Sequence, residues 1–304
     1  STWLRNAGDV TCIPIPCAFY ISASPVQSRT MGGLISTLAF PAPQLPREFY
    51  QDELMKRSDL HQFQTTQGER VPACYVRADR FGADVFPAAT RPTLLYSHGN
   101  AEDLALHLDF IDMLSQCTGA DVFSYDYVGY SLSRVLDDRQ PSEAGCYRSS
   151  EAAWRYCVEE LKIPPDRIVI FGRSIGSGPA IDLASRKDIE GTKYSPLDVR
   201  GVLLQSPIES GARAVFGWTV SMVGYAMDIF KNYEKIGNIR CPVAIMHGTA
   251  DEVVPVGNGK NLYDMSRNKF QPLWIEGYGH NNMPYEECFN YTKRFLKSIE
   301  PRDS

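Results

Sequence analysis

The sequence lacks paired cysteines of the kind that hold a zinc ion. None of its eight cysteines forms a Cys-x-x-Cys pair, the spacing that structural zinc sites use, and no motif for an organic cofactor is present, so we expect neither group. Several cysteines fall inside segments with a strand or helix pattern, as buried free thiols do. This pattern favours a reducing compartment over a disulfide-bonded secreted protein. The cysteines are Cys12, Cys17, Cys74, Cys117, Cys146, Cys157, Cys241 and Cys288.

The chain also lacks a strong charge of one sign and a long apolar run. Its 31 basic and 36 acidic residues give a net charge of -5, which does not favour a general nucleic-acid-binding protein. No apolar stretch reaches the roughly 20 residues of a membrane-spanning helix, and the apolar patch at residues 31–40 is too short. We therefore expect a cytoplasmic protein whose contact with membranes is peripheral and on their cytosolic face.

The most informative feature that is present is the pentapeptide Gly172-Arg173-Ser174-Ile175-Gly176. It follows the apolar run 167–171 and opens the small-residue stretch 178–184, so the pattern predicts a strand, a tight turn and a helix with Ser174 at the apex. A serine at such a strained turn needs neighbours without side chains, because the two arms otherwise collide. Chance produces this motif about 0.1 times in a chain of this length, so partners are needed to interpret it.

Those partners follow in the chain. Asp251 comes just after the apolar run 242–246, and His280 lies on a loop after the short run 271–275. The order serine, aspartate, histidine is the triad order of α/β-hydrolases, and each residue follows a predicted strand, where sites form in open α/β sheets. We predict Ser174 as nucleophile, His280 as base and Asp251 as the acid that orients it. Glu209, after the predicted strand 199–205, is the rival for the acid role.

A further strand ends in His98-Gly99-Asn100. In this fold the backbone N–H after such a glycine and the N–H after the nucleophile hold the oxyanion of acyl transfer. We therefore predict the main-chain N–H groups of Asn100 and Ile175 as the oxyanion hole. His98 and His247 are interpreted as structural residues that bond nearby backbone, and His61 and His107 as surface residues.

The chain of 304 residues is long enough for one large domain. Residues 1–60 are proline-rich and are predicted to form an irregular arm that can associate with a membrane. From residue 61 to 304, strand and helix patterns alternate with short connections, which predicts a mostly parallel sheet flanked by helices. The expected strands are 62–66, 70–78, 92–97, 121–125, 167–171, 199–205, 242–246 and 271–275, and the expected helices are 103–117, 143–161, 178–184, 257–266 and 284–299.

One segment departs from this alternation, at about residues 207–238. Its centre, 215–230, carries a single charge and is apolar around every helical face. Two compatible interpretations stay open: a buried helix, or a lid that walls an acyl-chain pocket or faces a membrane. The candidate pocket residues are Phe216, Trp218, Met222, Tyr225 and Met227.

Taken together, these motifs resemble the alpha/beta-hydrolase domain-containing 17 family over roughly residues 30 to 300. The resemblance rests on residues 38–43, 97–101, 125–131, 141–143, 172–179, 247–254 and 277–281. It implies an α/β-hydrolase fold and a serine hydrolase that removes palmitoyl groups from cysteines of membrane-attached proteins. It also implies membrane anchoring through acylated N-terminal cysteines, for which Cys12 and Cys17 are the candidates.

The sequence thus favours a palmitoyl-protein thioesterase that works through an acyl-enzyme intermediate, with palmitoylated proteins as substrates. A carboxylesterase or lysophospholipase that acts on small or lipid esters is the alternative on the same scaffold. A third hypothesis, from a different class, is a catalytically silent fold that serves as a membrane-associated interaction module. The complete set of three candidate catalytic residues argues against this third hypothesis.

Overall fold

The structure is a computed structural model that describes residues 40, 42–83, 85–216 and 228–299. The candidate acylation sites Cys12 and Cys17 lie outside these residues, as do four of the candidate pocket residues, Trp218, Met222, Tyr225 and Met227. Phe216 is the last residue of a short helix, α7. Within the described ranges, no helix is both long and apolar enough to cross a membrane.

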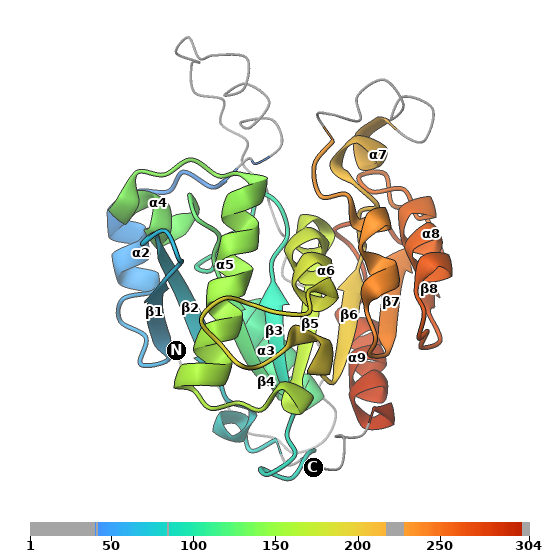
Figure 1. The fold of residues 1–304 in the computed structure, drawn as a ribbon, viewed down its shortest axis with the longest axis horizontal. Coiled ribbons are helices and arrows are strands. Elements are labelled where there is room, and N and C mark those ends of the chain that lie inside the picture. Colours follow the sequence, from blue (N-terminus) through green and yellow to red (C-terminus); the bar gives the residue numbers. More distant parts are fainter. Residues whose placement is uncertain (1–39, 41, 84, 217–227, 300–304) are drawn as a thin grey trace.

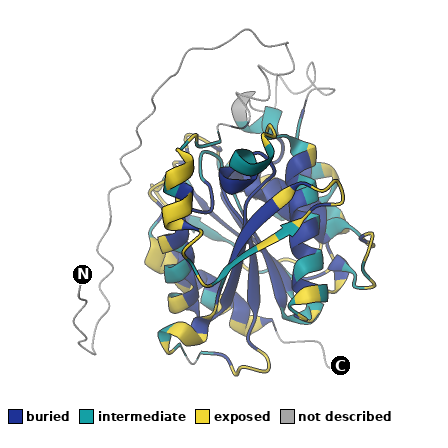
Figure 2. Cartoon of the chain, turned by 90° about the vertical axis from the view of Figure 1, so that its left-hand side faces the viewer, coloured by how far each residue is buried: buried dark blue, intermediate teal, exposed yellow. Residues whose placement is uncertain are grey.

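The described residues form one sheet of eight strands in the order β1-β2-β4-β3-β5-β6-β7-β8. β2 runs antiparallel to both β1 and β4, and the remaining pairs are parallel. The central strands β3 to β7 are mainly apolar and buried on both faces, as parallel strands covered by helices are (Figure 2). The strands are β1 (Leu60–Gln64), β2 (Arg70–Val76), β3 (Thr93–Ser97), β4 (Asp121–Tyr125), β5 (Ile168–Arg173), β6 (Gly201–Gln205), β7 (Val243–Gly248) and β8 (Leu273–Ile275).

Helices cover both faces of the sheet (Figure 1). α5, α6 and α8 pack on one face, while α3 and α9 pack on the other, with α2 beside them. Successive strand residues alternate between the two cores: in β3, Leu95 joins the first core, and Leu94 and Tyr96 join the second. The helices are α2 (Arg47–Glu53), α3 (Leu108–Thr118), α4 (Ser131–Asp137), α5 (Glu143–Arg155), α6 (Ser177–Ser185), α7 (Gly211–Phe216), α8 (Gly257–Met265) and α9 (Tyr285–Ser298).

The expected fold class, a mostly parallel sheet flanked by helices, is confirmed. Two helices were not expected. α2 lies within the arm predicted to be irregular, and α4 follows β4, where no helix was predicted. Both have seven residues, too few to show a helical period, and helices this short depend on tertiary packing. In α2 that packing comes from the fully buried Tyr50, with Leu54 just after the helix.

Two predicted helices differ at their ends. α3 begins at Leu108 rather than at 103, because the Asp103 carboxylate accepts the N–H of Leu106 and holds a turn there. α5 begins at Glu143 as predicted, where the Ser142 side chain accepts the N–H of Gly145. It ends at Arg155, and residues 156–160 continue as a π-helical turn.

The six described cysteines are free thiols, and all but Cys117 are buried. Burial raises the pKa of the Cys74 and Cys288 thiols to about 12. Thiols held in the neutral form in apolar surroundings are weak nucleophiles. These cysteines therefore act as core side chains, in agreement with their interpretation as buried free thiols.

Candidate active site

Ser174 lies at the turn between β5 and α6, as the pentapeptide predicted. Its backbone has φ 53°, a left-handed conformation that a non-glycine residue rarely adopts and that stores strain. A Cβ at Gly172 would come within 2.7 Å of the Gly176 carbonyl oxygen, and one at Gly176 within 2.2 Å of the Ser97 carbonyl oxygen. Both glycines are therefore required by backbone contacts, and the turn presses α6 against the end of β3.

The structure brings the three predicted side chains together. The His280 Nε2 atom lies 2.9 Å from Ser174 Oγ, and His280 Nδ1 lies 2.7 Å from Asp251 Oδ2. With Nδ1 protonated and bonded to the carboxylate, Nε2 is left as the acceptor for the Ser174 hydroxyl. This geometry can move a proton from the hydroxyl to the imidazole while the carboxylate stabilises the resulting imidazolium.

Asp251 is held by more than His280. Its Oδ1 atom accepts the backbone N–H groups of Val253 and Val254, at 2.9 and 2.7 Å, and His247 Nε2 lies 3.2 Å from Oδ2. Burial raises the pKa of Asp251, but hydrogen bonds from His247 and His280 outweigh it, so the pKa lies well below its usual range. The group is consequently an ionised carboxylate at neutral pH and in mild acid.

His247 was interpreted as a structural residue, and its Nε2 does lie 2.8 Å from the Val254 carbonyl oxygen. The ring therefore binds the loop that carries Asp251, in addition to contacting the carboxylate itself. The rival acid, Glu209, is engaged elsewhere: its carboxylate accepts hydrogen bonds from Arg213 and Asn261, at 2.7 and 2.9 Å.

The two predicted oxyanion donors come from segments that touch. Ile175 directly follows Ser174, and the close approach of Gly176 to the Ser97 and His98 carbonyl oxygens sets this turn against the loop that carries Asn100. The Tyr130 hydroxyl donates to Asn100 Oδ1 at 3.3 Å, and the Tyr127 hydroxyl donates to the His98 carbonyl at 2.8 Å. The loop after β4 thus supports the loop after β3.

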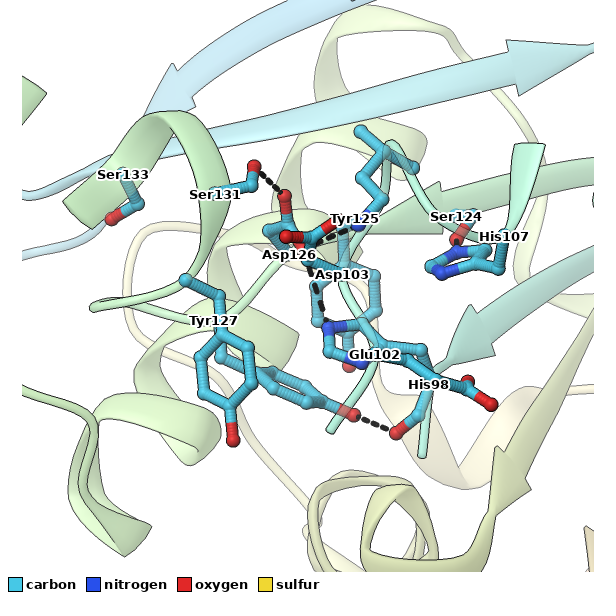
Figure 3. Close-up of polar contacts among 12 residues, drawn as sticks. His98, Glu102, Asp103, His107, Ser124, Tyr125, Asp126, Tyr127, Ser131 and Ser133 are labelled. Atoms are coloured by element: carbon cyan, nitrogen blue, oxygen red, sulfur yellow. Dashed lines mark hydrogen bonds and ion pairs between the residues drawn. The ribbon is translucent and has the colours of Figure 1, made fainter. Parts of the chain in front are cut away.

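Beneath these loops lies a buried polar cluster that sequence reasoning missed (Figure 3). His98 Nε2 lies 3.3 Å from Asp126 Oδ1, and its Nδ1 lies 2.8 Å from the Gly99 carbonyl oxygen, the backbone contact that was predicted. Asp126 also accepts hydrogen bonds from the Leu104 N–H and the Ser131 hydroxyl. Burial lowers the pKa of His98, but the hydrogen bond and charge of Asp126 outweigh it and raise the pKa overall.

The expectation that His107 lies on the surface is wrong. Its ring is buried, Nε2 lies 2.8 Å from the Ser124 hydroxyl, and burial lowers its pKa to about 4. His107 directly precedes α3, and its contact with Ser124 on β4 places the ring between this helix and the sheet. His61, the other histidine interpreted as exposed, is half-buried and bonds the Tyr156 hydroxyl at 3.0 Å.

A pH dependence of stability follows from Asp103, which accepts the Tyr50 hydroxyl at 2.7 Å. Burial and the nearby Asp126 charge raise its pKa from 3.8 to about 7. Between these values the folded state binds more protons than the unfolded state, so this group lowers the free energy of unfolding as pH rises. We expect Asp103→Asn to make the slope of that free energy between pH 4.5 and 7 less negative in urea titrations. The exposed Asp52→Asn is the matched control, and equal slopes for wild type and Asp103→Asn would contradict the assignment.

Near the nucleophile, apolar side chains gather around Phe230. A Cβ at Gly178, in the first turn of α6, would lie 2.2 Å from the Phe230 ring, and the rings of Phe40 and Tyr147 pack edge-on against it at 5.9 and 5.6 Å. The Phe230 N–H donates to Glu143 at 2.7 Å. Phe230, the last residue of the apolar centre of the expected lid, therefore packs over the start of α6. In the described ranges, no group of three or more His, Cys, Asp or Glu side chains is arranged to hold a metal ion.

Comparison with known proteins gives close sequence relatives. The chain is 36% identical over 233 residues to the human alpha/beta hydrolase domain-containing protein 17B, covering 76% of this chain and 73% of the relative. It is 33% identical over 253 residues to the Xenopus laevis protein 17C, covering 83% of this chain and 74% of the relative. The chain belongs to the alpha/beta hydrolase domain-containing protein 17 family. A scan against protein-family models found no match.

Solved structures agree with this family membership at the level of the fold. An esterase of Thermogutta terrifontis with bound propionate superposes with a TM-score of 0.59 at 18% identity, covering 82% of this chain and 98% of the esterase. A predicted CIB-like hydrolase of Thermoplasma acidophilum superposes with a TM-score of 0.52 at 20% identity, covering 79% and 99%. The family member described here is accordingly a hydrolase of the α/β-hydrolase superfamily.

Proposed function

We propose that this protein is a serine hydrolase that cleaves fatty-acyl thioesters from S-palmitoylated proteins through an acyl-enzyme intermediate. The observation that carries the proposal is the hydrogen-bonded chain from Ser174 through His280 to Asp251 at a strained turn. Ser174 is 7% exposed, so its hydroxyl lies at the edge of the packed interior, where water is largely excluded and electrostatic stabilisation is strong. The thioester preference is carried by the family resemblance.

In the proposed reaction, Ser174 Oγ attacks the acyl carbonyl while His280 Nε2 takes the hydroxyl proton. Asp251 keeps His280 in the tautomer that can accept this proton. The backbone N–H groups of Asn100 and Ile175 hold the tetrahedral oxyanion, and loss of one such donor costs about 10²–10³ in rate. The carbon–sulfur bond then breaks, and His280 gives its proton to the departing cysteine sulfur. The neutral His280 next takes a proton from water as the water oxygen attacks the acyl-Ser174 carbonyl, and it returns that proton to Ser174 Oγ as the fatty acid leaves.

A chemical argument supports a thioester as the substrate. A thiol has a pKa near 8.5 and leaves with little assistance, so the single base His280 is enough. Phe40 and Phe230 pack beside the first turn of α6, but both side chains are buried in the core, so the long acyl chain is proposed from the family resemblance. We propose that palmitoylated proteins at membranes are the substrates.

A substrate comparison tests the proposal. The purified full chain is offered an S-palmitoyl peptide, a short p-nitrophenyl ester and a lysophospholipid, and kcat/KM is measured for each. We expect the S-palmitoyl peptide to be preferred by about tenfold or more, which corresponds to about 1.4 kcal/mol in transition-state binding. A preference for either oxygen ester would instead identify a carboxylesterase or a lysophospholipase, and no turnover of any of the three would refute the hydrolase mechanism.

A further inference from the structure

Two charged side chains next to the oxyanion donors have no role in the reaction as described. Arg173 precedes Ser174 at the end of β5, and Glu102 follows Asn100 by two residues in the loop after β3. Arg173 Nη1 donates to Glu102 Oε1. The two side chains are each 18% exposed, so the pair is largely shielded from water and from the salt that weakens surface ion pairs.

The Glu102 carboxylate makes a second contact within its own loop. Its Oε2 atom accepts the backbone N–H of Gly99 at 3.2 Å, the peptide immediately before Asn100. One carboxylate therefore touches the residue before the nucleophile and the residue before the predicted oxyanion donor. Figure 3 shows Glu102 beside His98, in the loop that carries Asn100.

The ionisation of Glu102 agrees with this arrangement. Burial raises its pKa, but the charges of Arg173, His107 and His98 and the hydrogen bond from Gly99 outweigh it, so the pKa lies below its usual value. The carboxylate is therefore ionised at neutral pH, which strengthens both the ion pair and the hydrogen bond to the peptide N–H.

The spacing of the two donors depends on how their segments are joined. Gly176 contacts the Ser97 and His98 carbonyl oxygens, and this contact limits how closely the Ser174 turn can approach the loop after β3. That contact is repulsive at short range and cannot hold the segments together. The Arg173–Glu102–Gly99 connection is attractive and charge-assisted, so it complements the steric limit.

We infer that the Glu102–Arg173 ion pair positions the oxyanion hole by holding the Asn100 loop against the Ser174 turn. This inference rests on the proposed function, because it assigns both residues a purpose in stabilising the oxyanion. Glu102 and Arg173 are positioning residues that act through the two backbone donors. A variant that lacks the ion pair still has both backbone N–H groups, but the distance between them is no longer held constant.

The test uses the full chain with Arg173→Met, Arg173→Lys, Glu102→Gln and the double variant Arg173→Met with Glu102→Gln. With p-nitrophenyl butyrate as substrate, we expect each methionine or glutamine variant to lose about 10- to 100-fold in kcat, less than removal of a donor, with KM changed by less than about threefold. Arg173→Lys should recover part of the loss because its ammonium can still pair with Glu102. The double variant should resemble the single ones, since all of them break the same connection.

The matched control is Arg148→Met, which breaks another largely buried arginine–glutamate pair, Arg148–Glu69, away from the turn. We expect it to lower the thermal unfolding midpoint and leave kcat and KM within about twofold. Arg173→Met could instead lower the thermal unfolding midpoint as much as Arg148→Met does and change kcat no more than Arg148→Met does. The Glu102–Arg173 ion pair would then be structural, and the inference would be wrong.

Amide hydrogen exchange keeps the inference separate from the proposed function. Exchange in the peptide that contains Gly99 and Asn100 should be faster in Arg173→Met than in wild type. The reason is that the loop after β3 then lacks the ion pair between Glu102 and Arg173 and opens more often. Absence of hydrolysis by wild type, with no Ser174-dependent fluorophosphonate adduct, would refute the proposed function whatever the exchange shows. Unchanged exchange in Arg173→Met would overturn the positioning role whatever the activity.

Discussion

Ser174→Ala is expected to abolish hydrolysis of every acyl substrate, with kcat falling on the order of 10⁴- to 10⁶-fold. The reason is that His280 then has no hydroxyl to deprotonate, so no acyl-enzyme forms. The residual rate should reflect the oxyanion donors and substrate binding alone. The measurement is steady-state turnover of a p-nitrophenyl ester, together with intact-mass detection of a fluorophosphonate adduct that wild type forms and the variant does not.

The control for this variant is Ser185→Ala, at the other end of α6, where the hydroxyl donates to the Asp182 carbonyl. It should retain turnover within about twofold, because loss of a partly exposed hydrogen bond changes stability only slightly. An adduct that persists in Ser174→Ala would identify a different nucleophile. No adduct on wild type would favour the interaction-module hypothesis.

Asp251→Asn is expected to lower kcat by about 10⁴-fold with little change in KM. The variant keeps the size of the side chain, but its amide can present an N–H to His280 Nδ1. The imidazole then carries its proton on Nε2, so it cannot accept the Ser174 proton. Because the pKa of Asp251 lies well below its usual range, this carboxylate stays ionised on acidification, and the acid limb of the wild-type pH–rate profile should come from another group.

Glu209, the rival candidate for the acid role, provides the variant with which Asp251→Asn is compared. Glu209→Gln should lose less than about tenfold in kcat, since Glu209 bonds Arg213 and Asn261 and acts on the fold rather than on His280. A larger loss in Glu209→Gln than in Asp251→Asn would reverse the assignment. Circular dichroism of both variants shows whether a loss of activity reflects a loss of folded protein.

The central strands were predictable because they are short, mainly apolar runs bounded by turn residues, whereas the edge strand β1 mixes apolar and polar residues and begins two residues before the predicted range. β4 spans Asp121–Tyr125, the range predicted from its sequence, and all five of its residues are buried. α2 and α4 were not predictable in the same way. Each contributes one or two core side chains, such as Tyr50 and Leu132, and that number cannot establish a period.

For the histidines too, contacts with residues nearby in the chain were predictable and contacts with distant residues were not. His98 and His247 bond backbone atoms within seven residues, and such contacts are inferable from the local chain. His107 was placed wrongly because its partner, Ser124, lies 17 residues later in the chain, on β4. The contact between His247 and Asp251 was also missed, because the turn that follows β7 folds the carboxylate back towards the strand.

By itself, the sequence determined the chemistry and the local shape of the site: a serine between two glycines at a turn too tight for side chains, and an acid and a base after later strands. Steric limits within a few residues are enough for that. Only the tertiary structure decided that Ser174 and His280, separated by 106 positions, meet within 2.9 Å. It also decided that Glu102 reaches Arg173. Such contacts depend on which strands become neighbours in the sheet, and strand order follows from the packing of the whole domain.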